Sequence, residues 1–253
     1  MPRFVWTLAA VAVALGAAGC GDDDGGDRPR LVVSAASSLG EALTACSAGF
    51  EGADVRLSLA GSDELAAQIR QGVRPDVFAS ADSALPEALA AEGLAREPVA
   101  FAVNALVLAV PAGSGIDEIA DLARGDVSIA IGSPTVPIGA YTAEVLRRLP
   151  PAQADAIRAR VRTEEPDVKG IVGKLSQGAV DAGFVYRTDV RAAGDDLAAV
   201  ALPRALQPEV VYGAAVVEGA EQPALAERYV AALVDGPCGD ALRERGFGPP
   251  PAA

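Results

Sequence analysis

Short apolar runs with strand-like patterning and longer runs with helical spacing follow one another along this chain from Leu31 onward. The strand-like runs are residues 31–34, 54–59, 76–80, 106–110, 127–131, 181–186 and 210–217. The helix-like runs are residues 38–50, 62–71, 82–93, 116–123, 137–149, 153–161, 168–177, 224–233 and 238–245. Because strands separated by helices are typical of parallel sheets, the pattern predicts an α/β fold.

The predicted strands are too many for one compact sheet. We therefore predict two α/β lobes, each a mostly parallel sheet flanked by helices, with a ligand cleft between them. The chain is expected to cross between the lobes near Asn104 and to return near Tyr212. The first lobe then comprises residues 31–104 and 212–253, and the second comprises residues 105–211.

Four predicted strand-to-helix turns are expected to face this cleft. Ser38 and Ser62 lie in two such turns of the first lobe, and Ile138 and Val168 lie in two turns of the second. In open α/β sheets, ligands bind beyond the carboxyl ends of the strands. The first N–H groups of a helix have no intrahelical partner, so turns of this kind suit an oxyanion.

Composition removes several classes of function. The chain has 34 Asp and Glu against 21 Lys and Arg, which argues against a nucleic-acid partner because such a protein needs a basic face. A small anion remains compatible, since its binding depends on the local field inside a cleft. The chain has no histidine, which excludes Ser-His-Asp and Cys-His catalysis and His-ligated metal sites.

The first residues have the pattern of an export signal. Arg3 precedes an apolar run, and small residues lead to Cys20. We predict a signal peptide over residues 1–19, lipidation of Cys20 and a flexible charged tether over residues 20–30 that joins the membrane anchor to the folded domain. A plain secretory signal that happens to end before a cysteine is the alternative.

Two further cysteines, Cys46 and Cys238, lie in helix-like runs near opposite ends of the chain. An exported protein meets an oxidising compartment, so the two form a candidate disulfide. Two separate buried thiols are the alternative.

Several motifs, in this order and spacing, resemble the molybdate-binding receptors of ABC importers, the ModA family. The resemblance covers about residues 31–248 and rests on Ala35-Ala36-Ser37-Ser38-Leu39, Ala60-Gly61-Ser62 with Leu65-Ala66-Ala67-Gln68-Ile69, Asp76-Val77-Phe78-Ala79-Ser80-Ala81-Asp82, Gly132-Ser133-Pro134-Thr135-Val136-Pro137-Ile138-Gly139-Ala140-Tyr141, Asp181-Ala182-Gly183-Phe184-Val185-Tyr186-Arg187-Thr188-Asp189 and Arg245-Gly246-Phe247. It implies a type II periplasmic-binding-protein fold.

The resemblance also implies a ligand shell of neutral groups. The hydroxyls of Ser38, Ser62 and Tyr186 and the amides of Ile138 and Val168 are expected to hold molybdate or tungstate, with no other cofactor. The family usually has alanine where this chain has Ile138, and Ser37 is an alternative to Ser38. The implied partners are an ABC permease and its ATPase. We expect a monomer, held to the membrane through its lipid anchor only, that performs no chemistry on its ligand.

The chemistry of these residues agrees with that shell. A tetrahedral oxyanion offers acceptors only, and serine, tyrosine and helix N-terminal N–H groups are all donors. Neutral donors at fixed positions discriminate by size and protonation state, because each unpaired buried donor costs about 1–3 kcal/mol. Simpler interpretations are that Ser38 and Glu41 form a capping box, that Ser62 is a helix cap and that Tyr186 is a core residue.

Other functions remain as alternatives. The chain could be a receptor for sulfate, phosphate or ferric ion, although its four tyrosines are scattered. An exported serine hydrolase would use Ser38 or Cys46 as nucleophile and Lys169 or Lys174 as base. A lipoprotein adhesin or folding factor would present an exposed apolar groove in place of a closed polar cleft.

Overall fold

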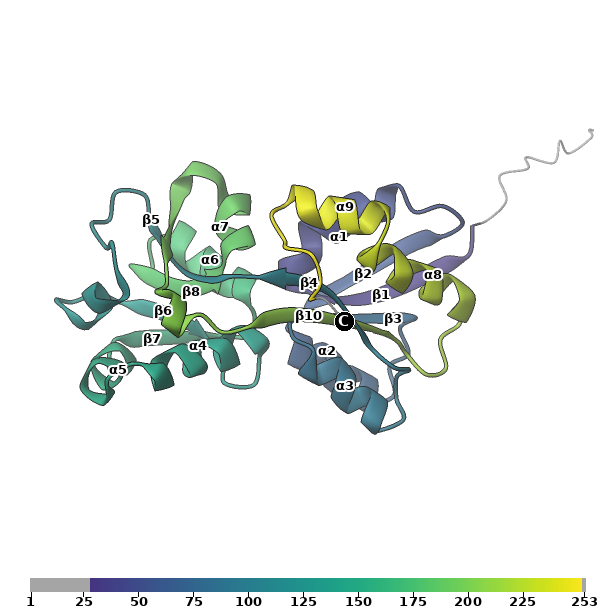
Figure 1. Cartoon of the computed structure of the whole chain (residues 1–253), viewed down its shortest axis with the longest axis horizontal. Coiled ribbons are helices and arrows are strands. Elements are labelled where there is room, and N and C mark those ends of the chain that lie inside the picture. The colour runs from purple at the N-terminus through teal and green to yellow at the C-terminus, as the bar shows by residue number, and fades with distance from the viewer. Residues whose placement is uncertain (1–27, 252–253) are drawn as a thin grey trace, which may run out of the picture.

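Strands and helices alternate through two lobes that lie side by side (Figure 1). The structure is a computed structural model and describes residues 28–251. The predicted signal peptide, Cys20 and all but the last three residues of the predicted tether lie outside the described residues. None of the described helices is both long and apolar enough to cross a membrane.

Each lobe is built on one five-stranded sheet. The first sheet has the order β2-β1-β3-β10-β4, and its strands are β1 (Arg30–Ala36), β2 (Asp54–Ala60), β3 (Val77–Ser80), β4 (Val99–Asn104) and β10 (Val210–Val216). The second sheet has the order β7-β6-β8-β5-β9, and its strands are β5 (Leu106–Pro111), β6 (Ile129–Gly132), β7 (Val161–Glu165), β8 (Ala182–Tyr186) and β9 (Leu197–Ala201).

In each sheet the strand that arrives from the other lobe runs against its neighbours. β1 pairs in parallel with β2 and β3, whereas β10 pairs antiparallel with β3 and β4. In the second sheet β6 pairs in parallel with β7 and β8, whereas β5 is antiparallel to β8 and β9. A crossing strand enters its sheet from the side at which the neighbouring strands finish, so it must run in the opposite direction. Four of five strands in each sheet therefore share one direction, which confirms the predicted two-lobed α/β fold.

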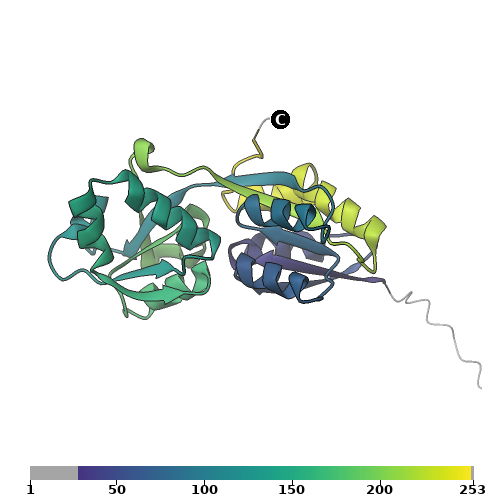
Figure 2. The same ribbon diagram turned by 90° about the horizontal axis from the view of Figure 1, so that it is seen from below.

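Helices cover both faces of each sheet (Figures 1 and 2). In the first lobe, Val77 and Ala79 face one apolar cluster and Phe78 faces another, as the two-residue period of a strand requires. The helices of this lobe are α1 (Gly40–Ala48), α2 (Ser62–Arg70), α3 (Ala84–Ala91), α8 (Pro223–Val234) and α9 (Pro237–Glu244). Those of the second lobe are α4 (Pro137–Arg148), α5 (Pro151–Arg158), α6 (Val168–Ser176) and α7 (Arg187–Ala193).

The sequence pattern missed the strands β4, β7 and β9 and the helix α7, and it extended several helices two or three residues too far. The helix predicted at residues 116–123 is a 3₁₀ turn over Ile119–Ala123, and the one predicted at 153–161 is α5. The missed strands β7 and β9 are sheet edges. β7 alternates half-buried with exposed polar residues, and β9 is rich in alanine, so neither carries a strong strand signal.

A disulfide joins α1 to α9. The structure pairs Cys46 with Cys238, whose Cα atoms lie 4.6 Å apart, and both side chains are buried. The bridge ties the C-terminal helix of the first lobe to its first helix, next to the turn that carries Ser38. Figure 1 shows α9 lying over α1.

Candidate functional site

Four turns from both lobes meet around one small cavity. It has an empty volume of about 200 Å³, open solvent at its mouth included. Its lining residues include Ala36, Ser37, Ser38, Ala60, Gly61, Ser62, Ala81, Val136, Pro137, Ile138, Asp167, Val168 and Tyr186. The structure thus places all five predicted site residues, and the alternative Ser37, around the same small space.

Ser62 presents a free hydroxyl proton to this space. It is the first residue of α2 and only 1% exposed, and its Oγ accepts a hydrogen bond from the Ala81 N–H at 3.1 Å. An amide can only donate, so the hydroxyl of Ser62 keeps its own proton for another acceptor. The N-cap of α2 is Gly61, and no side chain caps the helix, so Ser62 does not serve as a cap.

Ser38 lies in the 3₁₀ turn Ser37–Leu39 that precedes α1. No side chain caps this turn or α1, so the capping box of Ser38 and Glu41 is absent. Its Oγ instead lies 3.1 Å from the hydroxyl of Tyr212 on β10. In the sequence Tyr212 marks only the return to the first lobe, because no local pattern reveals a partner 174 positions away.

The second lobe contributes backbone amides. Ile138 lies in the first turn of α4 after Pro137, and Val168 is the first residue of α6. First-turn amides have no intrahelical acceptor, and within residues 28–251 neither amide donates a hydrogen bond to another protein group. The Asp167 carboxylate accepts from Gly170 N–H at 2.9 Å and thereby caps α6.

The Tyr186 hydroxyl has no hydrogen-bond partner among the described residues, although the side chain is only 1% exposed. Leaving such a donor unpaired costs about 1–3 kcal/mol. Burial raises the pKa of Tyr186 well above its usual value, so the phenol keeps its proton and remains a donor. Tyr186 therefore ends β8 with a proton that a ligand could accept.

The two lobes touch beside this cavity. Thr135 of the second lobe donates to the Asp63 carboxylate at 2.6 Å, and the Tyr141 hydroxyl donates to the Ala81 carbonyl at 3.4 Å. Gly61 lies so close to Pro166 that a Cβ atom built on it would sit 2.5 Å from the Pro166 carbonyl oxygen. These contacts hold the two halves of the donor set together.

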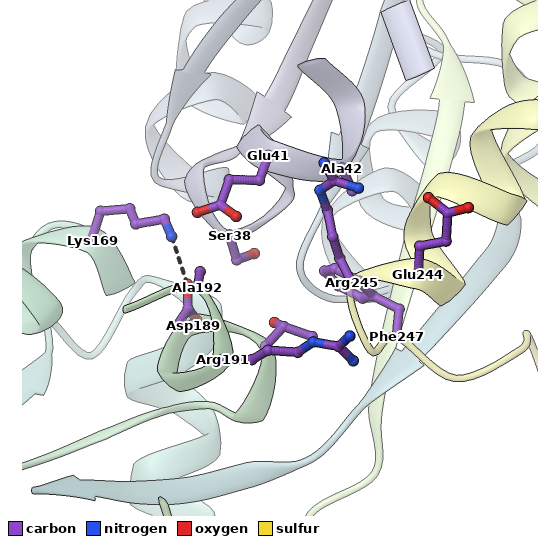
Figure 3. Close-up of a pocket in the computed structure, with 11 residues that line it drawn as sticks. Ser38, Glu41, Ala42, Lys169, Asp189, Arg191, Ala192, Glu244, Arg245 and Phe247 are labelled. Carbon is purple, nitrogen blue, oxygen red and sulfur yellow. Dashed lines mark ion pairs between the residues drawn. The ribbon is translucent and has the colours of Figure 1, made fainter. Parts of the chain in front are cut away.

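A second, larger cavity lies on the α1, α7 and α9 side of the cleft (Figure 3). It has an empty volume of about 770 Å³, open solvent at its mouth included. Ser38 is the one predicted ligand residue that lines it. Its charged lining residues balance in sign and are Glu41, Asp189, Glu244, Lys169, Arg191 and Arg245. The larger cavity therefore has no net formal charge that would favour an anion.

Asp189 is the buried charge of this larger cavity and was assigned no role from sequence. It is 1% exposed, and its carboxylate lies 3.1 Å from the Lys169 ammonium as an ion pair that lacks hydrogen-bond geometry. Burial raises the pKa of Asp189 to about 6, although Lys169 opposes the shift. The pair connects the start of α6, next to Val168, to the start of α7, next to Tyr186.

The residues do not support a hydrolase. Lys169 pairs with Asp189, and Lys174 lies 4.0 Å from the Glu165 carboxylate, so neither is a base for Ser38. Cys46 is bonded to Cys238 and is not a free nucleophile. Within the described part of the chain, no three His, Cys, Asp or Glu residues are grouped to hold a metal ion.

Similarity to known proteins agrees with this arrangement. Residues 31–248 match the family described as bacterial extracellular solute-binding protein. The molybdate-binding protein ModA of Mycobacterium tuberculosis is 34% identical, over 96% of this chain and 97% of that protein. The chain belongs to the ModA family of bacterial extracellular solute-binding proteins. It is a binding protein and not an enzyme, and it acts outside the cytoplasm, as predicted.

Solved structures show the same fold with different ligands. The periplasmic molybdate-binding protein of Azotobacter vinelandii superposes with a TM-score of 0.77 at 25% identity, covering 87% of this chain and all of that one. The sulfate-binding protein SubI of Mycobacterium tuberculosis has the same TM-score at 17% identity, covering 87% of each chain. The fold of a ModA-family chain therefore leaves the choice of anion to the residues of the cavity.

Proposed function

We propose that this protein binds molybdate, and also tungstate, outside the cytoplasmic membrane and delivers it to an ABC importer. The observation that carries the proposal is the convergence of Ser38, Ser62, Ile138, Val168 and Tyr186 on one small cavity. All five offer donors, and the lining contains no cationic side chain; its one carboxylate, Asp167, accepts from the Gly170 N–H. A set of neutral donors of this kind suits an anion that carries no proton.

The same shell disfavours two competing anions for different reasons. Phosphate near neutral pH carries at least one O–H group, so one of its oxygens would direct a proton at a set of groups arranged to donate. Sulfate carries no proton at that pH but is smaller than molybdate, so it cannot reach donors fixed on both lobes at once. Each unpaired buried group costs about 1–3 kcal/mol, or roughly a 5- to 150-fold loss of affinity.

Capture is proposed to proceed by closure of the lobes around the anion, with hinges at the two crossings. One crossing is the single residue Ala105 between β4 and β5, and the other is the segment that leads into β10. The closed monomer would be recognised by the permease of the importer, whose ATPase drives transport. Lipidation of Cys20 would anchor the receptor to the membrane. The folded domain would lie close to the anchor, because β1 begins only ten residues later, at Arg30.

Calorimetric titration of the purified protein tests the ligand. We expect tight binding of molybdate and tungstate, and affinities at least about 100-fold weaker for sulfate and phosphate. Ser62→Ala should weaken molybdate binding about 10-fold or more, since it removes a hydrogen bond to a charged group. The control Ser47→Ala alters a half-buried serine of α1 that contacts Tyr229 and not the cavity, and should bind as the wild type does.

Each part of the proposal can fail separately. Absence of binding heat with both molybdate and tungstate would refute the function. Tight molybdate binding that Ser62→Ala leaves unchanged would refute the site and leave the function standing. Release of a Cys20→Ser protein from membranes that retain the wild type would support the lipid anchor, and equal retention would refute it.

A further inference from the structure

Both serine hydroxyls of the candidate site have a hydrogen-bond partner behind them. For Ser62 the partner is the Ala81 N–H, so the direction of the bond is fixed and Ser62 Oγ accepts. For Ser38 the partner is the Tyr212 hydroxyl at 3.1 Å, and either oxygen could be the donor. The direction of this second bond decides whether Ser38 offers a proton or a lone pair to the cavity.

Tyr212 is held rigidly at the point where the chain returns to the first lobe. Its side chain is 0% exposed, and its ring packs edge-on against Tyr186, Phe101 and Phe247 at centroid distances of 5.7, 6.1 and 5.3 Å. Burial raises the pKa of Tyr212 well above its usual value, so its hydroxyl stays protonated. The ring contacts fix where that hydroxyl lies relative to Ser38.

The surroundings of Tyr212 favour one direction of the bond. Within residues 28–251, Ser38 is the hydrogen-bond partner found for the Tyr212 hydroxyl. If Ser38 donated, the buried proton of Tyr212 would have to find another acceptor. The neighbouring side chain of Asn104 interacts with Tyr212 as a donor, because it lowers the pKa of Tyr212, and its amide oxygen accepts from the Ala105 N–H.

We propose that Tyr212 is a specificity-determining residue of the oxyanion site, which donates its proton to Ser38 Oγ and so commits Ser38 to donate toward the anion. This inference rests on the proposed molybdate function. Tyr212 does for Ser38 what the Ala81 N–H does for Ser62, and each serine keeps its own proton for the anion. Each bond also occupies one of the two lone pairs of the serine oxygen, which disfavours an oxyanion that must donate a proton to it, and chained hydroxyls strengthen each other as donors.

The variant Tyr212→Phe removes the one oxygen and keeps the ring. We expect molybdate affinity to fall about three- to tenfold, because Ser38 loses the bond that orients it. Phosphate affinity should hold or rise, because the Ser38 hydroxyl is no longer oriented by Tyr212 and can turn to accept the proton of that anion. The ratio of molybdate to phosphate affinity should therefore narrow at least about fivefold. In a Ser38→Ala background, Tyr212→Phe should change neither affinity.

Tyr229→Phe is the matched control. Tyr229 is also 0% exposed, and its hydroxyl is also paired with a serine, Ser47, at 3.3 Å, but it lies on α8 away from the cavity. It should leave both affinities unchanged. This comparison separates the loss of a buried tyrosine–serine bond from the loss of control over Ser38.

The results with the wild type and with Tyr212→Phe test the proposed function and the role of Tyr212 separately. A wild-type protein that fails to bind molybdate refutes the proposed function. A wild type that binds, with an affinity ratio unchanged in Tyr212→Phe or an effect that persists without the Ser38 hydroxyl, overturns the role of Tyr212 alone. If Tyr212→Phe does not fold, a neutron structure of the wild type with molybdate decides. A deuteron on Tyr212 directed at Ser38 supports the inference, and one on Ser38 directed at Tyr212 overturns it.

Discussion

Removing the hydroxyl of Tyr186 should make the ligand-free protein more stable and lower its affinity for molybdate. This hydroxyl is buried and has no protein partner in the described structure, which costs about 1–3 kcal/mol. Tyr186→Phe removes that cost and keeps the ring contacts with Tyr141 and Tyr212. For a gain of about 1–2 kcal/mol in a chain of this size, the melting temperature should rise by about 2–8 °C.

The same substitution removes a hydrogen bond to a charged ligand, which is worth about 1.5–3 kcal/mol. Molybdate affinity should therefore fall about 10- to 150-fold. A ligand stabilises the folded state more strongly as the ratio of its concentration to its Kd rises. At saturating molybdate the wild type should therefore melt at the same temperature as Tyr186→Phe or at a higher one. Thermal melts with and without molybdate, beside a calorimetric titration, measure both effects.

The control and the refuting result are specific. Tyr229→Phe breaks a satisfied bond to Ser47, so it should lower the melting temperature and leave affinity unchanged. Lower stability of ligand-free Tyr186→Phe would show that its hydroxyl is already satisfied. Unchanged molybdate affinity would show that this hydroxyl does not contact the anion. Either result refutes the reasoning for Tyr186.

Three further predictions test other parts of the structure. Gly61→Ala should weaken molybdate binding at least about tenfold in calorimetry and expand the protein in solution scattering, because its Cβ would meet the Pro166 carbonyl across the cleft. The control Gly173→Ala should do neither, because its Cβ would meet only Gln177, at an ordinary contact distance of 3.9 Å. The pKa of Asp189 is about 6 in the folded protein against 3.8 in the unfolded chain, so the wild type loses stability as pH rises from about 4 to 6. The Asp189→Asn variant lacks this titration, so its unfolding free energy relative to that of the wild type should increase by about 1–3 kcal/mol between pH 4 and pH 7 in denaturant titrations. A difference that does not change with pH would contradict the raised pKa of Asp189. Replacing Cys46 and Cys238 with alanine should cost about 3–5 kcal/mol of unfolding free energy, given their separation of 192 residues, and leave molybdate affinity within about twofold; a stability loss under about 1 kcal/mol would argue against the bridge.

The sequence predicted the central elements of both sheets better than their edges. β1, β3, β5 and β8 are buried on both faces and appear in the chain as continuous apolar runs. β7 has the residues Val-Arg-Thr-Glu-Glu, with little apolar content, and becomes a strand only through its pairing with β6. Such edge strands depend on the sheet they join, so local pattern gives little sign of them.

The site divides in a similar way. The turns around Ser38, Ser62, Ile138 and Val168 combine short local motifs with a strand-to-helix position, and both are visible in the chain. The contacts that support them are not local, because Tyr212 reaches Ser38 over 174 positions and Thr135 reaches Asp63 over 72. The burial of Asp189 could not be predicted from local sequence either, since it arises where α7 faces residues of the other lobe, such as Ser38 and Glu41.

Anomalous diffraction at the molybdenum edge, from crystals of the protein grown with molybdate, tests the central claim most directly. We expect one strong peak in the small cavity, within about 4 Å of the hydroxyl oxygens of Ser38, Ser62 and Tyr186. We expect no peak in the charged cavity between Lys169, Arg191 and Arg245, whose acidic and basic groups balance. A peak in the charged cavity, or no peak between the lobes, would contradict the account.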